Sequence, residues 1–547
     1  MILPRTIWVL IVLQSLCIAT FLLAGCGRNG QSQIGQKHTI GKPEPGRILA
    51  RGLPGEPRTL DPQLADDTFS YQVVWDLFEG LTALDRDGSV TPGVASAWSS
   101  DPSGRIYTFA LRPEAKWSDG ERVTADEFVA GLRRAVDPAT ASGSAELLVT
   151  IKNASEIIQG KKPATELGVS APNENSVRIE LERPAPYILQ ILADPIAAPL
   201  HGSNSAGTTS NANRFATDGP YVVARRVPNS FIELIRNPNY WNVGQVAIEH
   251  VRYVNVESEA TELSEYTAGQ LDLTYSVPTP DLQRVSKELG DQLQTKPILG
   301  TLYLALNMKS APLRESRDLR QALSMAIDRD FIAEHLTLGV IPAYAFVARG
   351  IEDYEPPAYT WSTWSREQKL TYARNLYERA GYSAEHPLQL TLYFNSGEAN
   401  QRIMIAIAGA WRQNLGVETK LLYDEFRVFL IGRKDRTRWD AARLGWWADY
   451  NDPSSFLEIF SATSNQNDPG YESTEFNDLL RSARMNANNT ERMRTLRESE
   501  GVLLNDYPII PIYFYTSARL VKPYVGGAQI SPLRRTYSKH LFWRTSN

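Results

Sequence analysis

Residues 365–395 read SREQKLTYARNLYERAGYSAEHPLQLTLYFN and hold a helix, both of its ends and the strand that follows. The opening Ser-Arg-Glu-Gln forms a capping box, and apolar side chains recur after it at helical spacing. Gly381 suits the left-handed residue that commonly ends a helix. From Leu388 to Phe394 apolar and polar residues alternate at a period of two, which predicts a strand.

The neighbouring sequence extends this pattern. A helix is expected around residues 399–414 and a strand over 417–423, and an amphipathic helix over 319–327 precedes them. Nearer the N-terminus, Thr-Ala-Asp-Glu forms a second capping box and predicts a helix over 125–136, and residues 219–256 predict three strands joined by turns. Helices that alternate with strands indicate an α/β fold.

The N-terminus is typical of a secretory signal. A basic residue precedes an apolar run, and Leu-Ala-Gly stands directly before Cys26. This pattern resembles a bacterial lipoprotein signal, so we expect residues 1–25 to be removed, Cys26 to be lipidated, and residues 26–46 to form a flexible lipid tether. An ordinary signal peptide with an incidental cysteine is the alternative interpretation.

Composition excludes several classes of protein. The chain has 547 residues, a net charge of -5 and two cysteines, Cys17 in the signal and Cys26 at its end. The mature protein therefore has no disulfide and no cysteine-based metal site. The sequence has neither a basic run nor a recognisable nucleic-acid motif, and the common motifs for nucleotide binding and hydrolysis are absent as well. Six scattered histidines show no ligand spacing, so neither a metal nor a cofactor is expected.

A second cluster carries the functional signal. Trp446, Trp447 and Asp449 place two indoles beside one carboxylate, and Arg443 lies just before them. A carboxylate among aromatic rings is poorly hydrated and suits an ammonium group, and the arginine could receive the opposite end of a zwitterionic ligand. The alternative is that both indoles are core residues and the carboxylate caps a turn before Pro453.

Blocks along the mature chain resemble those of the oligopeptide-binding lipoproteins of ABC transporters, the oligopeptide-binding branch of bacterial extracellular solute-binding protein family 5. The resemblance covers nearly all of the mature sequence. Its blocks are TLDP at 59–62, DLFEGL at 76–81, PGVASAW at 92–98, YTFALR at 107–112, KWSDGERVTAD at 116–126, NPNYWN at 237–242, GWWADYN at 445–451 and ARLVKPYVGG at 518–527.

The resemblance implies an α/β clamp of the two-lobed periplasmic-binding-protein type (type II, cluster C), with an additional domain and with the ligand enclosed between the lobes. It also implies a division of the chain. We expect a discontinuous lobe I made of residues 47–78, 210–299 and 517–547, an additional domain over 79–209, and lobe II over 300–516.

The resemblance also assigns roles to single residues. Asp449 matches the residue that pairs with the ammonium group of a peptide. Arg443, Arg433 and Lys309 match positions that receive the peptide carboxylate, each for a different ligand length. Asp66 matches an acidic residue near the ligand, whose main chain is bound as an added strand.

Four further positions bear on the ligand. Trp446 and Trp447 flank the carboxylate, and Trp447 is expected to narrow the first pocket. Close relatives carry a histidine at Asn400, and some carry a cysteine pair at Gly300 and Trp447. Loss of the histidine favours ligands whose carboxylate reaches Arg443, although neutral drift is an alternative for each departure.

The expected function is that of an extracytoplasmic receptor that binds short peptides by their termini and main chain. Catalysis is not expected. The expected partners are membrane permease and ATPase subunits, and the lipid anchor would hold the protein, as a monomer, in the periplasm or at the cell surface. A murein-peptide receptor and a peptide-sensing or chaperone lipoprotein are the alternatives. Ligand length and the membrane that carries the anchor stay open.

Overall fold

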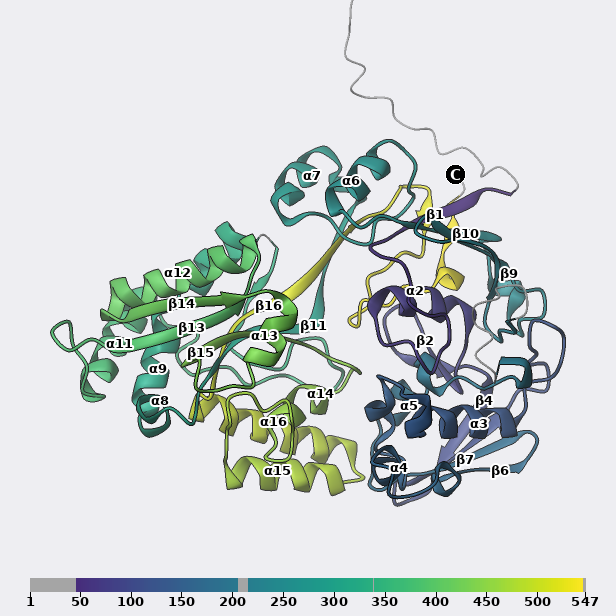
Figure 1. Cartoon of the computed structure of the whole chain (residues 1–547), viewed down its shortest axis with the longest axis horizontal. Helices are drawn as coiled ribbons and strands as arrows, with labels where there is room; N and C mark the ends of the chain where they lie inside the picture. The colour runs from purple at the N-terminus through teal and green to yellow at the C-terminus, as the bar shows by residue number, and fades with distance from the viewer. Residues whose placement is uncertain (1–45, 205–214, 338, 545–547) are drawn as a thin grey trace, which may run out of the picture. The chain divides into compact units, whose positions relative to one another are not determined.

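The computed structural model describes residues 46–204, 215–337 and 339–544, all within one compact unit, residues 43–544 (Figure 1). The predicted signal peptide, Cys26 and the predicted tether up to residue 45 lie outside the described residues. Within the described ranges, no helix combines the length and apolar character that crossing a bilayer requires.

The N-terminal part of the chain builds a four-stranded sheet in the order β1-β10-β9-β8. Its first two strands are parallel and the others antiparallel, which confirms the three strands predicted over 219–256. Asp67 caps α2 by accepting hydrogen bonds from two backbone N–H groups. The elements are β1 (Ile48–Leu53), β8 (Tyr221–Val227), β9 (Phe231–Arg236), β10 (His250–Asn255), α2 (Thr68–Leu77), α6 (Glu259–Thr267) and α7 (Leu282–Glu288).

A second four-stranded antiparallel sheet, in the order β4-β5-β7-β6, lies within the range predicted for the additional domain. Helix α3 begins and ends at the predicted residues, and its capping box between Thr124 and Glu127 is present. The elements are β2 (Thr82–Leu84), β3 (Val90–Pro92), β4 (Ala95–Ser100), β5 (Ile106–Leu111), α3 (Ala125–Val136), α4 (Ala154–Ile158), β6 (Val169–Asn173), β7 (Ser176–Glu180) and α5 (Ile188–Ile191).

The central part of the chain forms a mixed six-stranded sheet in the order β12-β16-β11-β15-β13-β14. The helix–strand–helix–strand succession predicted from 365 onward is confirmed. The strands are β11 (Leu293–Leu306), β12 (Ile341–Pro342), β13 (Gln389–Asn395), β14 (Glu418–Asp424), β15 (Ala441–Trp447) and β16 (Ile509–Leu520).

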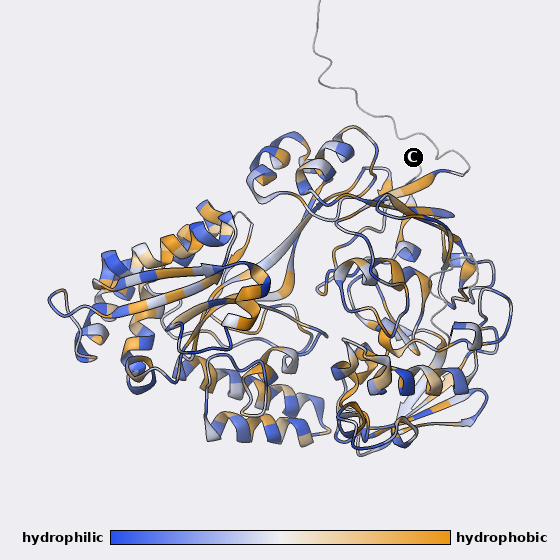
Figure 2. Cartoon of the chain, in the orientation of Figure 1, coloured by the Kyte–Doolittle hydropathy of each residue, from blue (hydrophilic) through white to orange (hydrophobic). Residues whose placement is uncertain are grey.

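Helices lie around this sheet. They are α8 (Ala311–Glu315), α9 (Arg317–Ala326), α10 (Arg329–Phe331), α11 (Arg366–Arg379), α12 (Glu398–Leu415), α13 (Phe426–Gly432), α14 (Ser454–Leu457), α15 (Thr474–Met485) and α16 (Asn489–Asp506). Most of these helices contribute apolar side chains to the core of the sheet, while α15 packs on α16. Figure 2 shows hydrophilic residues along much of the helices' outer surface. Two short strands, β17 (Val525–Gly526) and β18 (Phe542–Trp543), pair near the C-terminus.

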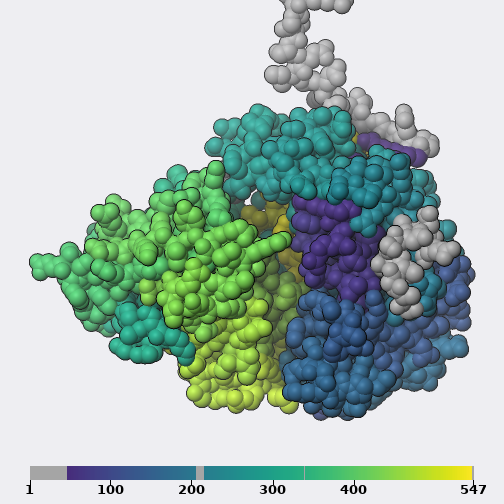
Figure 3. Space-filling model, viewed as in Figure 1, coloured from purple at the N-terminus to yellow at the C-terminus, as the bar shows by residue number. Residues whose placement is uncertain are grey.

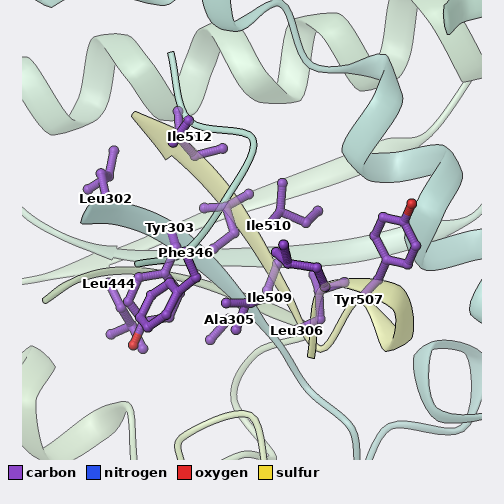
Figure 4. Packing of buried hydrophobic residues seen from close by; sticks show 14 of the residues in the cluster. Leu302, Tyr303, Ala305, Leu306, Phe346, Leu444, Tyr507, Ile509, Ile510 and Ile512 are labelled. Carbon is purple, nitrogen blue, oxygen red and sulfur yellow. The ribbon is translucent and has the colours of Figure 1, made fainter. Parts of the chain in front are cut away.

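Two strands run from one core to the next. The ends of β11 and β16 near Leu306 and Ile510 pack in the core of the six-stranded sheet (Figure 4). Their other ends, at Leu293 and Leu520, pack with α6 and α7. The register shifts at residues 297–301, between the two halves. The proposed boundaries of lobe II fall inside these strands, so in the proposed division the two strands would connect the lobes.

The hydrophobic core is divided accordingly. One cluster of buried side chains lies within residues 299–514, close to the range proposed for lobe II. Another spans residues 49–541 and joins the first four-stranded sheet to the second. Lobe I and the additional domain therefore share a continuous core, and the division between them stays a proposal.

Candidate functional site

Strand β15 presents two different faces. Ala442 and Leu444 are buried in the core of lobe II, whereas Arg443, Gly445 and Trp447 retain solvent access. This alternation follows from the period of two in a strand. The accessible face of β15 therefore carries an arginine at one end and an indole at the other.

Tyr515 of β16 lies along this accessible face. Its ring stacks on Trp447 with centroids 4.7 Å apart, and its hydroxyl accepts a 3.4 Å hydrogen bond from Nη2 of Arg443. A Cβ atom at Gly445 would lie 2.7 Å from that hydroxyl, and one at Gly300 would lie 2.6 Å from Cδ1 of Trp447. Both glycines therefore leave room for aromatic side chains.

One edge of β15 is open. Residues 441–447 all pair with β11, but on the opposite side only Ala441 and Ala442 pair with β13. From Arg443 to Trp447, no described strand pairs with this second edge. Backbone N–H and C=O groups along such an edge can bind an added strand.

A pocket of about 400 Å³ lies at the Trp447 end of this edge. Figure 3 shows the surface hollowed where the purple N-terminal segment, the green residues of lobe II and the yellow C-terminal segment meet. Its walls are mainly aromatic and aliphatic, with a few polar groups, as in many small-molecule sites. The lining residues are Thr68, Tyr71, Gln72, Trp75, Tyr275, Ile298, Leu299, Trp447, Ala448, Pro532, Leu533 and Arg534.

Asp449 follows directly after this lining. Its backbone N–H donates a 2.9 Å hydrogen bond to Oγ of Ser455, which orients the loop. The capping role belongs instead to Asp452, whose carboxylate accepts from the backbone N–H of Ser454 and pairs with Arg492 at 2.6 Å. In the described residues no hydrogen bond or ion pair engages the carboxylate of Asp449, so this group is available to a ligand.

The surroundings of Asp449 disfavour its charge. The residue retains solvent access, yet the protein around the cleft desolvates the carboxyl group and raises its pKa to about 6. Asp194 raises this pKa further, while Arg535 opposes it. These two residues form a buried 2.9 Å ion pair. A ligand ammonium beside Asp449 would favour the charged form.

The loop is also anchored to the additional domain. Tyr450 stacks on Tyr187 with centroids 4.4 Å apart and planes 9° apart. The side chain of Gln190 donates a 3.1 Å hydrogen bond to the backbone carbonyl of Asn451. Because segments on both sides of the proposed division hold this loop, the position of Asp449 depends on both.

The three predicted carboxylate receptors differ in their partners. Arg443 donates to the neutral groups Asn395 Oδ1, at 3.1 Å, and the hydroxyl of Tyr515, and no described carboxylate pairs with it. Arg433 is paired with Asp468 at 3.0 Å. Lys309 is paired with Glu472 at 2.6 Å. Of the three predicted carboxylate-binding side chains, Arg443 is the one whose positive charge no described carboxylate already pairs.

The remaining predicted residues lie around this centre. Trp446 is half-buried against the core of lobe II and donates to the backbone carbonyl of Ser455 at 2.7 Å, so it positions the loop. Trp447 is 46% exposed. Asn400 lies in α12 and donates to the carbonyl of Asn395 at 3.3 Å. Asp66 is exposed, just before α2, and pairs with Arg58.

Sequence reasoning missed several wall residues. Tyr71 and Trp75 of α2, Tyr515 of β16 and Leu533 all line or border the pocket. Each is one aromatic or aliphatic residue among many, and all are far in sequence from Trp447. Their role therefore has no local signal.

The structure also brings Asp119, Glu121 and His201 together. Nε2 of His201 lies 3.4 Å and 3.3 Å from carboxylate oxygens of the two acids, and its Nδ1 accepts a 3.2 Å hydrogen bond from the backbone N–H of Ser203. This bond leaves the ring proton on Nε2, which favours donation to the carboxylates over ligation of a metal.

Comparison with known proteins places these features in context. The family description "Bacterial extracellular solute-binding proteins, family 5 Middle" matches residues 89–468. The chain is 37% identical to the periplasmic oligopeptide-binding protein OppA of Salmonella typhimurium, over 91% of this chain and 92% of that protein. It is 35% identical to the periplasmic murein peptide-binding protein MppA of Escherichia coli, over 90% and 93%.

Solved structures agree with these matches. The unliganded open form of MppA superimposes with a TM-score of 0.82 at 34% identity and covers 91% of this chain and 97% of that one. Haemophilus influenzae OppA in complex with the peptide RPPGFSPFR gives a TM-score of 0.73 at 31% identity, over 91% and 98%. The expected α/β two-lobed clamp is confirmed by these similarities.

Proposed function

Because the chain belongs to the bacterial extracellular solute-binding proteins of family 5, we propose that it is the peptide-binding receptor of an ABC importer. It binds short peptides and delivers them to a membrane permease, while a separate ATPase supplies the energy. Other family members are substrate-binding proteins, which accords with a role in binding and not in catalysis.

The observation that carries this proposal is the open edge of β15 between two opposite charges. Within the described part of the chain, the second edge of residues 443–447 offers backbone groups that no strand pairs; Arg443 stands at one end and Asp449 follows the other. A peptide added as a strand along this edge would pair its ammonium group with Asp449 and direct its carboxylate toward Arg443.

The spacing of these groups indicates the length of the ligand. A strand rises about 3.3 Å per residue, so Arg443 and Trp447 are separated by about 13 Å along β15. An extended peptide of three to five residues spans about 10–18 Å, which is comparable. Arg433 and Lys309 would serve longer ligands only after leaving their present carboxylate partners.

The placement in the cell follows from the same proposal. Relatives of this chain are periplasmic binding proteins. We place this protein in the periplasm or at the cell surface, as a monomer held by lipid on Cys26. Nucleic acid is not among the proposed partners, since the chain has a net charge of -5.

Titration calorimetry tests the proposal. The soluble form that begins after Cys26, freed of bound ligand, is titrated with a lysine-containing tripeptide and with its N-acetylated twin. We expect one-to-one binding of the free tripeptide. Acetylation or Asp449→Ala should weaken it at least about tenfold, because either change removes one partner of a desolvated charge pair.

The matched control is Asp478→Ala, which removes an exposed carboxylate of α15 and should leave affinity unchanged. Equal binding of both peptides, or a change of less than about threefold in Asp449→Ala, would contradict the role of the carboxylate. A murein tripeptide also carries a free amino group, so the loss of affinity in Asp449→Ala does not separate the two receptor classes. A direct comparison of its affinity with that of the lysine-containing tripeptide does. Binding of that ligand alone would favour a murein-peptide receptor.

A further inference from the structure

A second, smaller cavity adjoins the large pocket. Its volume is about 30 Å³, and it shares the wall residues Gln72, Tyr275 and Arg534 with the pocket described above. Two more arginines, Arg51 and Arg519, complete a basic lining. The cavity lies where β16, which connects the lobes, reaches lobe I.

Arg519 is a buried guanidinium with neutral partners. It is 7% exposed, and its Nη1 donates a 2.7 Å hydrogen bond to Oγ1 of Thr536. Its Nε and Nη2 approach Oε1 of Gln294 at 3.4 Å. No described carboxylate pairs with Arg519, and burial together with the charge of Arg51 lowers its pKa to about 9.

Arg51 adds a second buried cation. It is 5% exposed and donates to the hydroxyl groups of Tyr253 and Ser538 and to the carbonyl of Thr536. Its carboxylate partner is Asp76, with 3.6 Å between Nη1 and Oδ2. This single carboxylate compensates one of the two buried guanidinium groups.

Arg534, which is half-buried, contributes a third guanidinium group to the lining. Its guanidinium lies 5.3 Å from the centre of the Tyr275 ring, in cation–π geometry, and its backbone adopts the left-handed conformation with φ of 61°. The cavity lining therefore holds two buried guanidinium groups and the half-buried one of Arg534. Among the described residues, the carboxylates closest to these walls are Asp76 and Glu262, and burial raises the pKa of Glu262 to about 7, which reduces its negative charge. Such an excess of buried positive charge is unfavourable unless an anion compensates it.

We propose that the cavity lined by Arg51, Arg519 and Arg534 binds a small anionic group. A volume of about 30 Å³ exceeds the roughly 10–15 Å³ that one water molecule requires, so a halide ion or a single carboxylate group fits. The anion comes either from solution or from an acidic side chain of a peptide in the adjoining pocket. The first source is independent of the proposed function, and the second rests on it.

The solution source is tested without any peptide. Thermal unfolding is measured in sodium chloride and in sodium gluconate at equal ionic strength, and crystals soaked in bromide are examined for anomalous scattering. A free-anion site predicts a melting temperature that rises with chloride concentration and a bromide peak beside Arg519. Arg519→Gln should remove both effects, Arg519→Lys should restore part of the chloride dependence, and Arg494→Gln, on the surface of α16, should change neither.

The peptide source is tested by calorimetry with tripeptides that carry glutamate or glutamine at each position in turn. If a side-chain carboxylate occupies the cavity, one glutamate peptide binds at least tenfold more tightly than its glutamine twin, and Arg519→Gln removes the difference. Binding of the glutamine peptides reports separately on the proposed function. Absence of a chloride effect, of a bromide peak and of any glutamate preference would overturn the proposed anion site.

Discussion

Burial raises the pKa of Asp449 to about 6, so the proposed pairing of this carboxylate with a peptide ammonium should make binding depend on pH. The charge pair needs the carboxylate, so affinity should be high above this pKa and fall as the pH drops below it. Between pH 7 and pH 5 we expect the dissociation constant to rise about tenfold, because binding then requires removal of a proton. Calorimetry across this pH range measures how the dissociation constant depends on pH, and Asp449→Asn should abolish that dependence. An equal dissociation constant at both ends would refute the assignment.

Arg443 offers a second prediction at the scale of a residue. Arg443→Gln should weaken binding of a free tripeptide about tenfold or more, since the ligand carboxylate would lose its ionic partner. A C-terminally amidated twin should bind the wild type and the variant alike. Arg481→Gln, which changes an exposed arginine of α15, is the matched control. If the amidated and free peptides lose the same affinity, Arg443 does not bind the carboxylate.

At the scale of elements, Gly300 and Trp447 face each other across β11 and β15. Gly300→Ala should destabilise the protein by about 1–3 kcal/mol, because the added methyl group displaces the indole from Tyr515. In a Trp447→Ala background, Gly300→Ala should lower the free energy of unfolding much less, since the indole that the new methyl group would meet is absent. Chemical denaturation of the four proteins in this double-mutant cycle measures the coupling. Additive effects would show that the indole does not require the glycine.

At the scale of the whole molecule, stability should depend on two buried carboxyl groups. Burial raises the pKa of Glu262 in α6 and of Glu500 in α16 to about 7. Between pH 4.5, the ordinary pKa of a glutamate, and pH 7, the folded protein holds these two protons while the unfolded chain has released them, so the free energy of unfolding falls as the pH rises. The melting temperature of the ligand-free protein should therefore decrease by a few degrees from about pH 5 to pH 8.

Differential scanning calorimetry over this range checks the direction. The double variant Glu262→Gln and Glu500→Gln should show a flatter profile. Burial lowers the pKa of His540 to about 4, so this residue opposes the trend below pH 6.5, but the two glutamates together outweigh it. A melting temperature that rises between pH 5 and pH 8 would contradict the prediction.

Local sequence was enough to predict most elements. The capping box at Thr124 and the alternation from Leu388 to Phe394 correspond to α3 and β13, with shifts of at most one residue. Hydrogen bonds at a helix end and the burial of one strand face depend on neighbours within a few residues. Asp449 stood out as a candidate ligand for the same reason, since its aromatic neighbours are contiguous with it in the sequence.

Tertiary structure decided what surrounds these residues. It paired Arg433 with Asp468, left Arg443 with neutral partners, and brought Tyr515 onto Trp447. It also opened one edge of β15 and gathered three distant arginines around one small cavity. Such contacts join residues that are tens to hundreds of positions apart, and the charge or room available to each side chain depends on which segments the fold brings together.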